Sequence, residues 1–201
     1  MCTKKTVREK KSGGNLFLSL IFKGYGIELR PVRPEDLPSL RRWRNTPTIR
    51  NMMNDTSYIT PQQQRTWFEN TSNSIDQAQW VVWCKGGKTG YVNIKGKGYL
   101  KSRPHVSGGY YIAETPFRHP LVSYAVMLMY HDIVFDYMEV PLIKGNILKK
   151  NKSSLKLNKD FGYQEVSETT ESVSVIIKAS DYAIKRTKFL RYFKDTHCRI
   201  V

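Results

Sequence analysis

The segment at residues 121–138, LVSYAVMLMYHDIVFDYM, constrains the possible folds more than any other. It predicts a long helix with apolar side chains on most of its faces. Such a helix is stable in water only when other elements cover it, so we expect it to lie deep inside a domain. No apolar run approaches the length of about 20 residues that a membrane-spanning helix needs, which predicts no transmembrane segment.

Strands that can cover this helix are predicted before and after it. Alternating or β-branched apolar runs predict strands at 26–33, 79–84, 89–95, 106–113, 140–147 and 172–178. Further helices are predicted at 34–45, from 60 to 68 and at 151–163. The order β-α-α-β-β-β-α-β-α-β predicts a single mixed α/β (α+β) domain, with a central sheet of about six to seven strands and about four helices.

The second of these helices has the clearest start signal. Thr60 is a residue type that caps helix N-termini, Pro61 suits the first helical position, and Gln63 completes a capping box. We therefore expect this helix to begin at Pro61 and to continue to Trp67 and Phe68.

The charge of the chain favours anionic partners. The formal net charge is +16 and the pI is about 9.8, which suits phosphates, nucleotides, nucleic acid or an anionic membrane surface. Part of the excess lies at residues 4–11 and 185–199, which are interpreted as solvated basic arms. The chain then divides into a basic N-terminal extension at 1–25, a folded domain at 26–180 and a basic C-terminal segment at 181–201.

The cysteines and histidines do not predict a metal site. Cys2, Cys84 and Cys198 lie far apart in the sequence, and there is neither a CxxC motif nor a zinc-like Cys/His spacing. This cysteine usage is typical of a reducing compartment, so we expect a cytoplasmic protein.

Residues 29–70 read LRPVRPEDLPSLRRWRNTPTIRNMMNDTSYITPQQQRTWFEN. An LRP strand, an acidic pair, a helix ending in WRN, a Met-rich turn and a helix ending in WF follow one another. In this order the segment resembles the opening of the GCN5-related N-acetyltransferases (GNAT), in the branch of the ribosomal-protein and nucleotide-amino-sugar acetyltransferases. The resemblance spans about residues 26–178. It implies a GNAT-like domain in which the fourth and fifth strands, here 106–113 and 140–147, splay apart to admit acetyl-coenzyme A (acetyl-CoA).

The helix predicted at 151–163 carries the second part of the resemblance. Five residues match the spacing of the family helix that follows the fifth strand: Asn151, Ser154, Leu157, Gly162 and Tyr163. The resemblance implies that this helix walls a coenzyme A slot. Asn151 would reach the pantetheine or the neighbouring backbone, and Ser154 would let the cofactor lie close. Gly162 can adopt the left-handed conformation that ends a helix.

The loop before the buried helix departs from the family pattern. Where the family has a glycine-containing phosphate signature, this chain reads ETPFRHPLVSYAV, with no glycine in either register. In one reading, Pro120 starts the helix, amides near 121–124 still bind the pyrophosphate, and nearby side chains add charge. In the other, coenzyme A binding is weakened or lost. The first reading implies these cofactor-binding residues: Ile112, Arg118, His119, Leu121, Val122 and Ser123.

Acetyl transfer to an amine needs a proton acceptor and stabilisation of a tetrahedral oxyanion. The resemblance implies that backbone amides at 110–112 polarise the thioester carbonyl. Glu114 is the first candidate for the general base, although it also fits a plain loop carboxylate. Many family members place a tyrosine acid where this chain has Asn158. Either the thiolate leaves unaided, or another side chain serves, with these candidates: Tyr110, Tyr111, Ser123 and Tyr124.

The acceptor pocket is expected over the first two helices. Its implied residues offer a stacking face, a cation, an amide and an adaptable wall: Trp43, Arg44, Asn45, Met52 and Met53. These groups suit a nucleotide-linked amino sugar. The leading hypothesis is therefore an N-acetyltransferase that moves an acetyl group from acetyl-CoA to the primary amine of such a small acceptor. Trp43 also fits a core position.

Two other functions remain open from the sequence. The same acceptor residues fit a peptide N-terminus, as in protein N-terminal acetylation of the ribosomal-protein type. The third hypothesis is a non-catalytic GNAT-like module that binds nucleic acid or another anionic partner through the basic ends, with an affinity that falls steeply with salt. Dimers are common in the family, which allows a homodimer.

Overall fold

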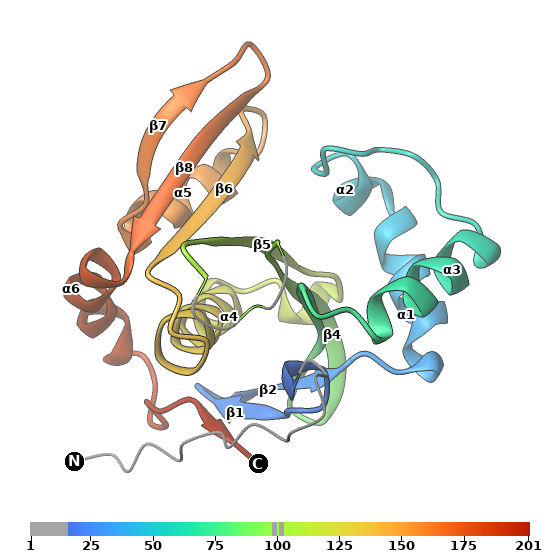
Figure 1. Ribbon diagram of the computed structural model, residues 1–201, viewed down its shortest axis with the longest axis horizontal. Helices are drawn as coiled ribbons and strands as arrows, with labels where there is room; N and C mark the ends of the chain where they lie inside the picture. Colours follow the sequence, from blue (N-terminus) through green and yellow to red (C-terminus); the bar gives the residue numbers. More distant parts are fainter. Residues whose placement is uncertain (1–15, 98–99, 101–102) are drawn as a thin grey trace.

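The computed structural model describes residues 16–97, 100 and 103–201. It contains one nine-stranded mixed sheet in the order β7-β8-β6-β5-β4-β3-β2-β1-β9 (Figure 1). The strands are β1 (Phe22–Gly24), β2 (Ile27–Pro31), β3 (Gln77–Cys84), β4 (Gly87–Lys95), β5 (Val106–Ile112), β6 (Leu142–Leu148), β7 (Gln164–Glu168), β8 (Ser172–Lys178) and β9 (Arg199–Ile200). The α-helices are α1 (Leu37–Asn45), α2 (Pro47–Arg50), α3 (Pro61–Ser72), α4 (Pro120–Asp132), α5 (Lys152–Phe161) and α6 (Ala179–Leu190). The predicted basic arm at 4–11 lies outside the described residues.

All strands predicted from the sequence are present, but the predicted number of six to seven is too low. The additional strands are β1, β7 and β9. β7 is exposed along its whole length, and β1 and β9 contain only three and two residues, so no run of apolar alternation marks them. The described residues also form six α-helices rather than about four, because the short α2 and the C-terminal α6 are additional.

Helices cover both faces of the sheet (Figure 1). In β3, Trp80 and Val82 belong to the core that α4 covers, whereas Val81 between them belongs to a second core with Leu40 and Trp43 of α1. This alternation follows from the strand period of two. Hence α4 lies against one face of the sheet, and α1 and α3 lie against the other.

The apolar segment at 121–138 lies in the core, as predicted. α4 begins at Pro120 and continues into a π-helical turn at Ile133–Tyr137. Every residue from 125 to 134 is buried. The helix therefore packs against one face of the sheet, beneath its central strands.

β5 and β6 are parallel neighbours at one end only. Val106 pairs with Ile143 and Ser107 pairs with Lys144, and no further pair joins them in the described residues. Beyond Ser107, β5 remains paired with β4 and β6 remains paired with β8, so the two strands diverge. The predicted splay of these strands is confirmed, and it opens the sheet at its centre.

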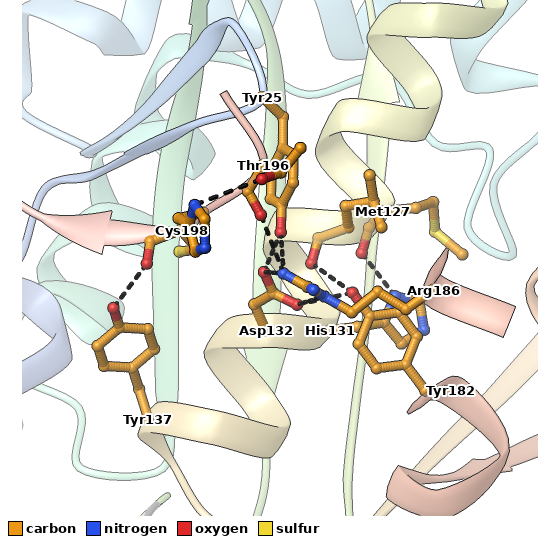
Figure 2. Close-up of polar contacts among 11 residues, drawn as sticks. Tyr25, Met127, His131, Asp132, Tyr137, Tyr182, Arg186, Thr196 and Cys198 are labelled. Carbon is orange, nitrogen blue, oxygen red and sulfur yellow. Dashed lines mark hydrogen bonds and ion pairs between the residues drawn. The ribbon is translucent and has the colours of Figure 1, made fainter. Parts of the chain in front are cut away.

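The C-terminal segment packs onto the domain through a buried ion pair. Arg186 of α6 lies 3.0 Å from Asp132 of α4, whose side chain is 2% exposed. Figure 2 shows that Asp132 also accepts hydrogen bonds from the hydroxyls of Tyr25 and Tyr182. Phe189 of α6 is buried as well. The interpretation of residues 185–199 as a solvated arm is therefore wrong around α6, because Arg186 pairs with buried Asp132 and Phe189 is itself buried.

His131 of α4 is buried and makes two hydrogen bonds. Its Nδ1 lies 2.5 Å from the Met127 carbonyl oxygen, which can only accept, so this nitrogen carries the proton. Its Nε2 lies 3.1 Å from the Tyr163 hydroxyl, which therefore donates to a neutral ring. Burial lowers the pKa of His131 to about 4, and the hydrogen bond to Met127 and the charge of Asp132 offset only part of this shift.

We expect acid to destabilise the fold through His131. The unfolded chain binds a proton at the ordinary pKa of about 6.5, whereas the folded chain binds it at about 4. The contribution of the neutral ring to stability is therefore complete above about pH 6.5 and is lost as the pH falls toward 4, by up to about 1.4 kcal/mol per pH unit. Urea unfolding across this pH range measures the slope. His131→Phe should flatten it, and His105→Gln, which changes an exposed histidine, should not. Equal slopes for the wild type and His131→Phe would contradict this expectation.

Candidate functional site

A large cleft opens where β5 and β6 diverge. Its volume is about 1420 Å³. Residues of α1, α2 and α3, with the loop at 52–59, line one part of it, which we call the α1–α3 half. Residues of α4 and α5 line the other part, which we call the α4–α5 half, and β4, β5 and β6 contribute between them.

The α4–α5 half is walled by the start of α5. Asn151 caps this helix, since its Oδ1 accepts from the Ser154 amide and from the Ser153 hydroxyl, each over 3.1 Å. Asn151 and Ser154 both line the cleft. Gly162 ends the helix with a φ of 98°, the left-handed conformation predicted there. Asn158 donates its side-chain amide to the Ser154 carbonyl oxygen at 2.8 Å, so that amide is held within the helix.

The backbone amides at the start of α4 are already hydrogen-bonded. Pro120 has no amide hydrogen, and the Leu121 amide donates to Nδ1 of His119, the N-cap residue, at 3.2 Å. The Val122 and Ser123 amides donate to the His119 carbonyl oxygen at 3.0 and 3.3 Å. An anion bound at this turn would therefore contact side chains rather than backbone amides, unless it displaced the His119 ring from the Leu121 amide.

The residues predicted around this loop divide into two groups. Those that line the cleft are Ile112, Arg118, His119 and Ser123. Leu121 and Val122 are not among the lining residues. Arg118 is anchored, because its Nη2 donates to the Ala113 carbonyl oxygen at 2.8 Å and lies 3.4 Å from Oγ1 of Thr48.

Three tyrosine hydroxyls gather in the α4–α5 half: Tyr110 of β5, Tyr130 of α4 and Tyr163 after α5. Burial raises the pKa of each phenol, and Tyr130 and Tyr110 lie near enough to raise that of Tyr163 further. The Ser123 side chain offsets part of the rise in the pKa of Tyr110, and the Tyr163 hydroxyl is hydrogen-bonded to His131. The Tyr130 hydroxyl has no hydrogen-bond partner in the described part of the chain.

Three of the residues predicted for the acceptor line the α1–α3 half: Arg44, Met52 and Met53. Nη2 of Arg44 donates to the Asp55 carbonyl oxygen, whereas Nη1 is buried without a hydrogen-bond partner among the described residues. Tyr111 lines this half too. Burial raises the pKa of Tyr111, and the Arg44 guanidinium offsets part of that rise. A buried N–H group without a partner favours a ligand that can accept a hydrogen bond.

Trp43, Asn45 and Glu114 lie outside the residues that line the cleft. Trp43 is 4% exposed, and its Nε1 donates to Oε1 of Glu114 at 2.6 Å. Arg42 forms an ion pair with the same oxygen at 2.9 Å. Both amide atoms of Asn45 bond the Ile59 backbone, each over 2.8 Å. These three predicted side chains therefore bond other groups of the protein and do not line the cleft.

Sequence reasoning missed the lining residues of β4 and Tyr130 of α4. Tyr91, Asn93 and Lys95 of β4 line the cleft and alternate with buried Val92 and Ile94, so the strand period of two is the signal that points to them. Tyr130 had no such signal, because an aromatic residue in an apolar helix is normally interpreted as a core residue.

The charge of the cleft is predominantly positive. Its cationic lining residues are Arg44, Lys95, Arg118, Lys144 and Lys156, and its carboxylates are Asp55 and Asp160. The Asp160 carboxylate is 3.0 Å from the Lys156 ammonium, and that of Asp55 accepts from the Ser57 amide at 2.8 Å. The excess positive charge favours an anionic ligand.

The site offers an open slot with donors along its walls. Across residues 16–97, 100 and 103–201, no group of three or more His, Cys, Asp or Glu side chains is placed to hold a metal ion. In the same residues, no helix has both the length and the apolar character that crossing a membrane requires. The cleft can receive an extended anionic molecule between β5 and β6 and a second molecule from the α1–α3 half.

A scan against known protein families matches residues 27–164 to the family described as Acetyltransferase (GNAT) domain. The match covers most of the sheet and the whole of the cleft-lining segment from α1 to Tyr163. No curated protein sequence matches the chain.

Several solved acetyltransferase structures share the fold. Apo FdhC, a nucleotide-linked sugar GNAT, has a TM-score of 0.71 at 16% identity, over 85% of this chain and 97% of that one. Spermidine N-acetyltransferase from Vibrio cholerae, in complex with CoA and spermine, has a TM-score of 0.70 at 14% identity, over 79% and 98%. Aminoglycoside acetyltransferase AAC(6')-Ib, in complex with coenzyme A, has a TM-score of 0.66 at 14% identity, over 80% and 99%. At these low sequence identities, the structural similarity shows only that the fold is shared.

Proposed function

The chain belongs to the acetyltransferase (GNAT) domain family, and from this we propose that it transfers an acetyl group from acetyl-CoA to the primary amine of a small anionic acceptor. A nucleotide-linked amino sugar is the leading candidate for that acceptor. The observation that supports an anionic acceptor is that Nη1 of Arg44, a cleft-lining residue, is buried without a hydrogen-bond partner among the described residues.

The α4–α5 half fits coenzyme A in shape and in charge. Past Ser107, the edge of β5 that faces β6 has no strand partner in the described part of the chain, so its backbone groups can bond the pantetheine arm. Ser154 lines the cleft with a small side chain that leaves room for the arm, and Arg118 and Lys156, which also line the cleft, supply positive charge for the phosphates. When bound, acetyl-CoA supplies an activated acetyl thioester.

The α1–α3 half fits an amine that also carries a phosphate or a carboxylate. Arg44 can donate from its unpartnered nitrogen to such a group, and Lys95 adds positive charge to the cleft wall. Polyamines and aminoglycosides are polycations, and a site with this charge repels them. The spermidine and aminoglycoside enzymes with the same fold are therefore poorer guides to this acceptor than the nucleotide-linked sugar enzyme.

In this function the chain works mainly by positioning two reactants and stabilising charge. The open edge of β5 offers backbone amides to the oxyanion that forms at the acetyl carbonyl. The acceptor amine must lose a proton. Because Glu114 is bonded to Trp43 and Arg42 outside the cleft, we assign that proton to water in the open cleft.

An acceptor screen tests this function. The purified protein and acetyl-CoA are offered a UDP-linked amino sugar, a peptide with a free N-terminus, spermidine and an aminoglycoside, and thiol release is measured. We expect turnover of the sugar nucleotide and competition by UDP. Turnover of the peptide without UDP competition would assign protein N-terminal acetylation instead. No turnover, together with RNA binding that collapses with salt, would assign the non-catalytic module.

We expect Arg44→Gln to raise KM for the anionic acceptor by about 10- to 100-fold, since a hydrogen bond from a charged donor contributes about 1.5–3 kcal/mol. The KM for acetyl-CoA should not change, because Arg44 lies in the α1–α3 half. Arg41→Gln removes the same charge from the same helix, outside the cleft, and should leave both KM values near those of the wild type. Equal effects of the two variants would show that Arg44 acts only through net charge and would remove the support for a bound anion.

A further inference from the structure

Tyr130 is a buried tyrosine that lines the cleft, and its enclosed hydroxyl has no hydrogen-bond partner among the described residues. It shares one face of α4 with Ser123 and Met127, at helical spacing, and all three line the cleft. Its side chain is 4% exposed, and the hydroxyl has no hydrogen bond within the described residues. A Cβ added at Gly108 would lie 2.9 Å from the hydroxyl oxygen. The hydroxyl therefore lies beneath β5, one residue past Ser107, where β5 and β6 begin to part.

A buried hydroxyl without a hydrogen-bond partner lowers the stability of the fold, so its presence at this position suggests another role. Burying a donor without an acceptor costs free energy that phenylalanine, with the same ring, would avoid. The neighbouring Tyr163 differs, because its hydroxyl donates to Nε2 of His131 at 3.1 Å. A ligand atom that accepts a hydrogen bond in the cleft would satisfy the hydroxyl of Tyr130.

Tyr130 lies on the face of the sheet opposite to the acceptor residues. Tyr110 is the β5 partner of Val92, which belongs to the core beneath α4, so this side of β5 faces Tyr130. Tyr111, the next residue, packs against Tyr91 on the face covered by α1 and α3. An amine held in the α1–α3 half therefore approaches a thioester in the slot from one face. If the thioester is attacked from that face, its sulfur leaves toward the opposite face, on which Tyr130 lies.

We propose that the Tyr130 hydroxyl donates a hydrogen bond to the sulfur atom of coenzyme A and stabilises the thiolate as it leaves. The inference rests on the proposed acetyl-CoA site. In the transfer, the acceptor nitrogen bonds to the acetyl carbon, the carbon–sulfur bond breaks with its electron pair on sulfur, and the nitrogen loses one proton to water. Tyr130 keeps its own proton throughout, and burial, which raises the pKa of its phenol, favours this role of donor over that of acid. Tyr130 would thus supply from α4 the donor that Asn158 of α5 does not.

The test is the affinity of the protein for coenzyme A relative to desulfo-coenzyme A, which lacks the sulfur, measured by calorimetry at pH 7 and pH 9. The wild type should prefer coenzyme A, and more so at pH 9, because a larger fraction of the thiol is then thiolate, which accepts a stronger hydrogen bond. Tyr130→Phe should lose most of this preference, which we expect to be about tenfold at pH 9. The control Tyr137→Phe removes a hydroxyl that donates to the Cys198 carbonyl oxygen outside the cleft, and it should keep the preference.

Two further readouts separate function from folding. Tyr130→Phe should melt no lower than the wild type, since it removes an unsatisfied buried donor and keeps the ring. Its kcat for acetyl transfer should fall by about 10- to 100-fold. If the wild type binds coenzyme A and Tyr130→Phe shows the same preference for sulfur, the inference is wrong and the proposed function stands. If the wild type binds neither ligand, both are wrong.

Discussion

Replacing Gly109 by leucine is expected to abolish acetyl transfer while leaving the fold intact. Gly109 of β5 lines the cleft, and a Cβ added there would meet no atom within 4 Å. It pairs with Asn93 of β4, on the face that α1 and α3 cover, so a leucine side chain would fill the path from the acceptor to the thioester. We expect kcat/KM to fall by about a hundredfold or more, because misplacing reacting groups by even about 1 Å has an effect of that size. The free energy of unfolding should stay within about 0.5 kcal/mol of the wild type.

The neighbouring glycine gives a matched control for this effect. A Cβ at Gly108 would point to the opposite face, into the Asn93 carbonyl oxygen and to within 2.9 Å of the Tyr130 hydroxyl. Gly108→Ala should therefore destabilise the fold by about 1–3 kcal/mol, as overpacked sites do. Thiol-release kinetics and urea unfolding of both variants give the comparison. Wild-type kinetics in Gly109→Leu would mean that the acceptor does not pass this part of the cleft.

Removing the carboxylate of Asp132 is expected to cause the largest loss of stability. Asp132 accepts from Arg186, Tyr25 and Tyr182, and its side chain is 2% exposed (Figure 2). Asp132→Ala leaves the half-buried Arg186 guanidinium without its carboxylate partner and removes an acceptor from the Tyr25 and Tyr182 hydroxyls. Breaking a buried ion pair from one side costs about 3–5 kcal/mol, so we expect a drop of this size in the free energy of unfolding. The loss should also detach α6, which hydrogen exchange of its amides measures.

The exposed pair at the end of the chain is the control for Asp132. Asp195 and Arg199 lie 2.8 Å apart with partly exposed side chains. Asp195→Ala should change the free energy of unfolding by less than about 0.5 kcal/mol, since solvent screens such pairs. A similar small change in Asp132→Ala would contradict the view that the network of Figure 2 fixes α6 to the domain.

Local signals in the sequence predicted the helix ends that frame the cleft. The capping box predicted at Thr60 is present, with the Gln63 amide donating to Oγ1 of Thr60 at 3.2 Å and the Gln63 side chain accepting from the Thr60 amide at 2.8 Å. Asn151 caps α5, and Gly162 ends it. These features depend on residues a few positions apart, so one sequence contains all the information that they require.

Features that depend on distant residues were not predictable in the same way. The partners Asp132 and Arg186 are 54 positions apart, and nothing near either residue marks the pair. Trp43 and Glu114 bond each other across 71 positions, and neither side chain lines the cleft. A carboxylate at the end of a strand has the right chemistry for a base, but only the fold decides which partner it meets.

The altered loop before α4 also needed the structure. The sequence shows that the phosphate glycines are absent, and it leaves open whether amides near 121–124 replace them. In the structure, the ring and the carbonyl oxygen of His119 accept hydrogen bonds from the amides of residues 121–123. Positive side chains that line the cleft, such as Arg118 and Lys156, are the groups that remain to contact phosphates.

The most direct test of the central claim, that the cleft between β5 and β6 holds acetyl-CoA, is calorimetric titration of the purified protein with acetyl-CoA at moderate salt. We expect saturable binding of one molecule per chain with a Kd between about 1 µM and 1 mM, the usual range for enzyme substrates. The affinity should weaken as salt rises, because side-chain cations rather than glycine amides meet the phosphates. A titration without binding up to about 1 mM would contradict the claim.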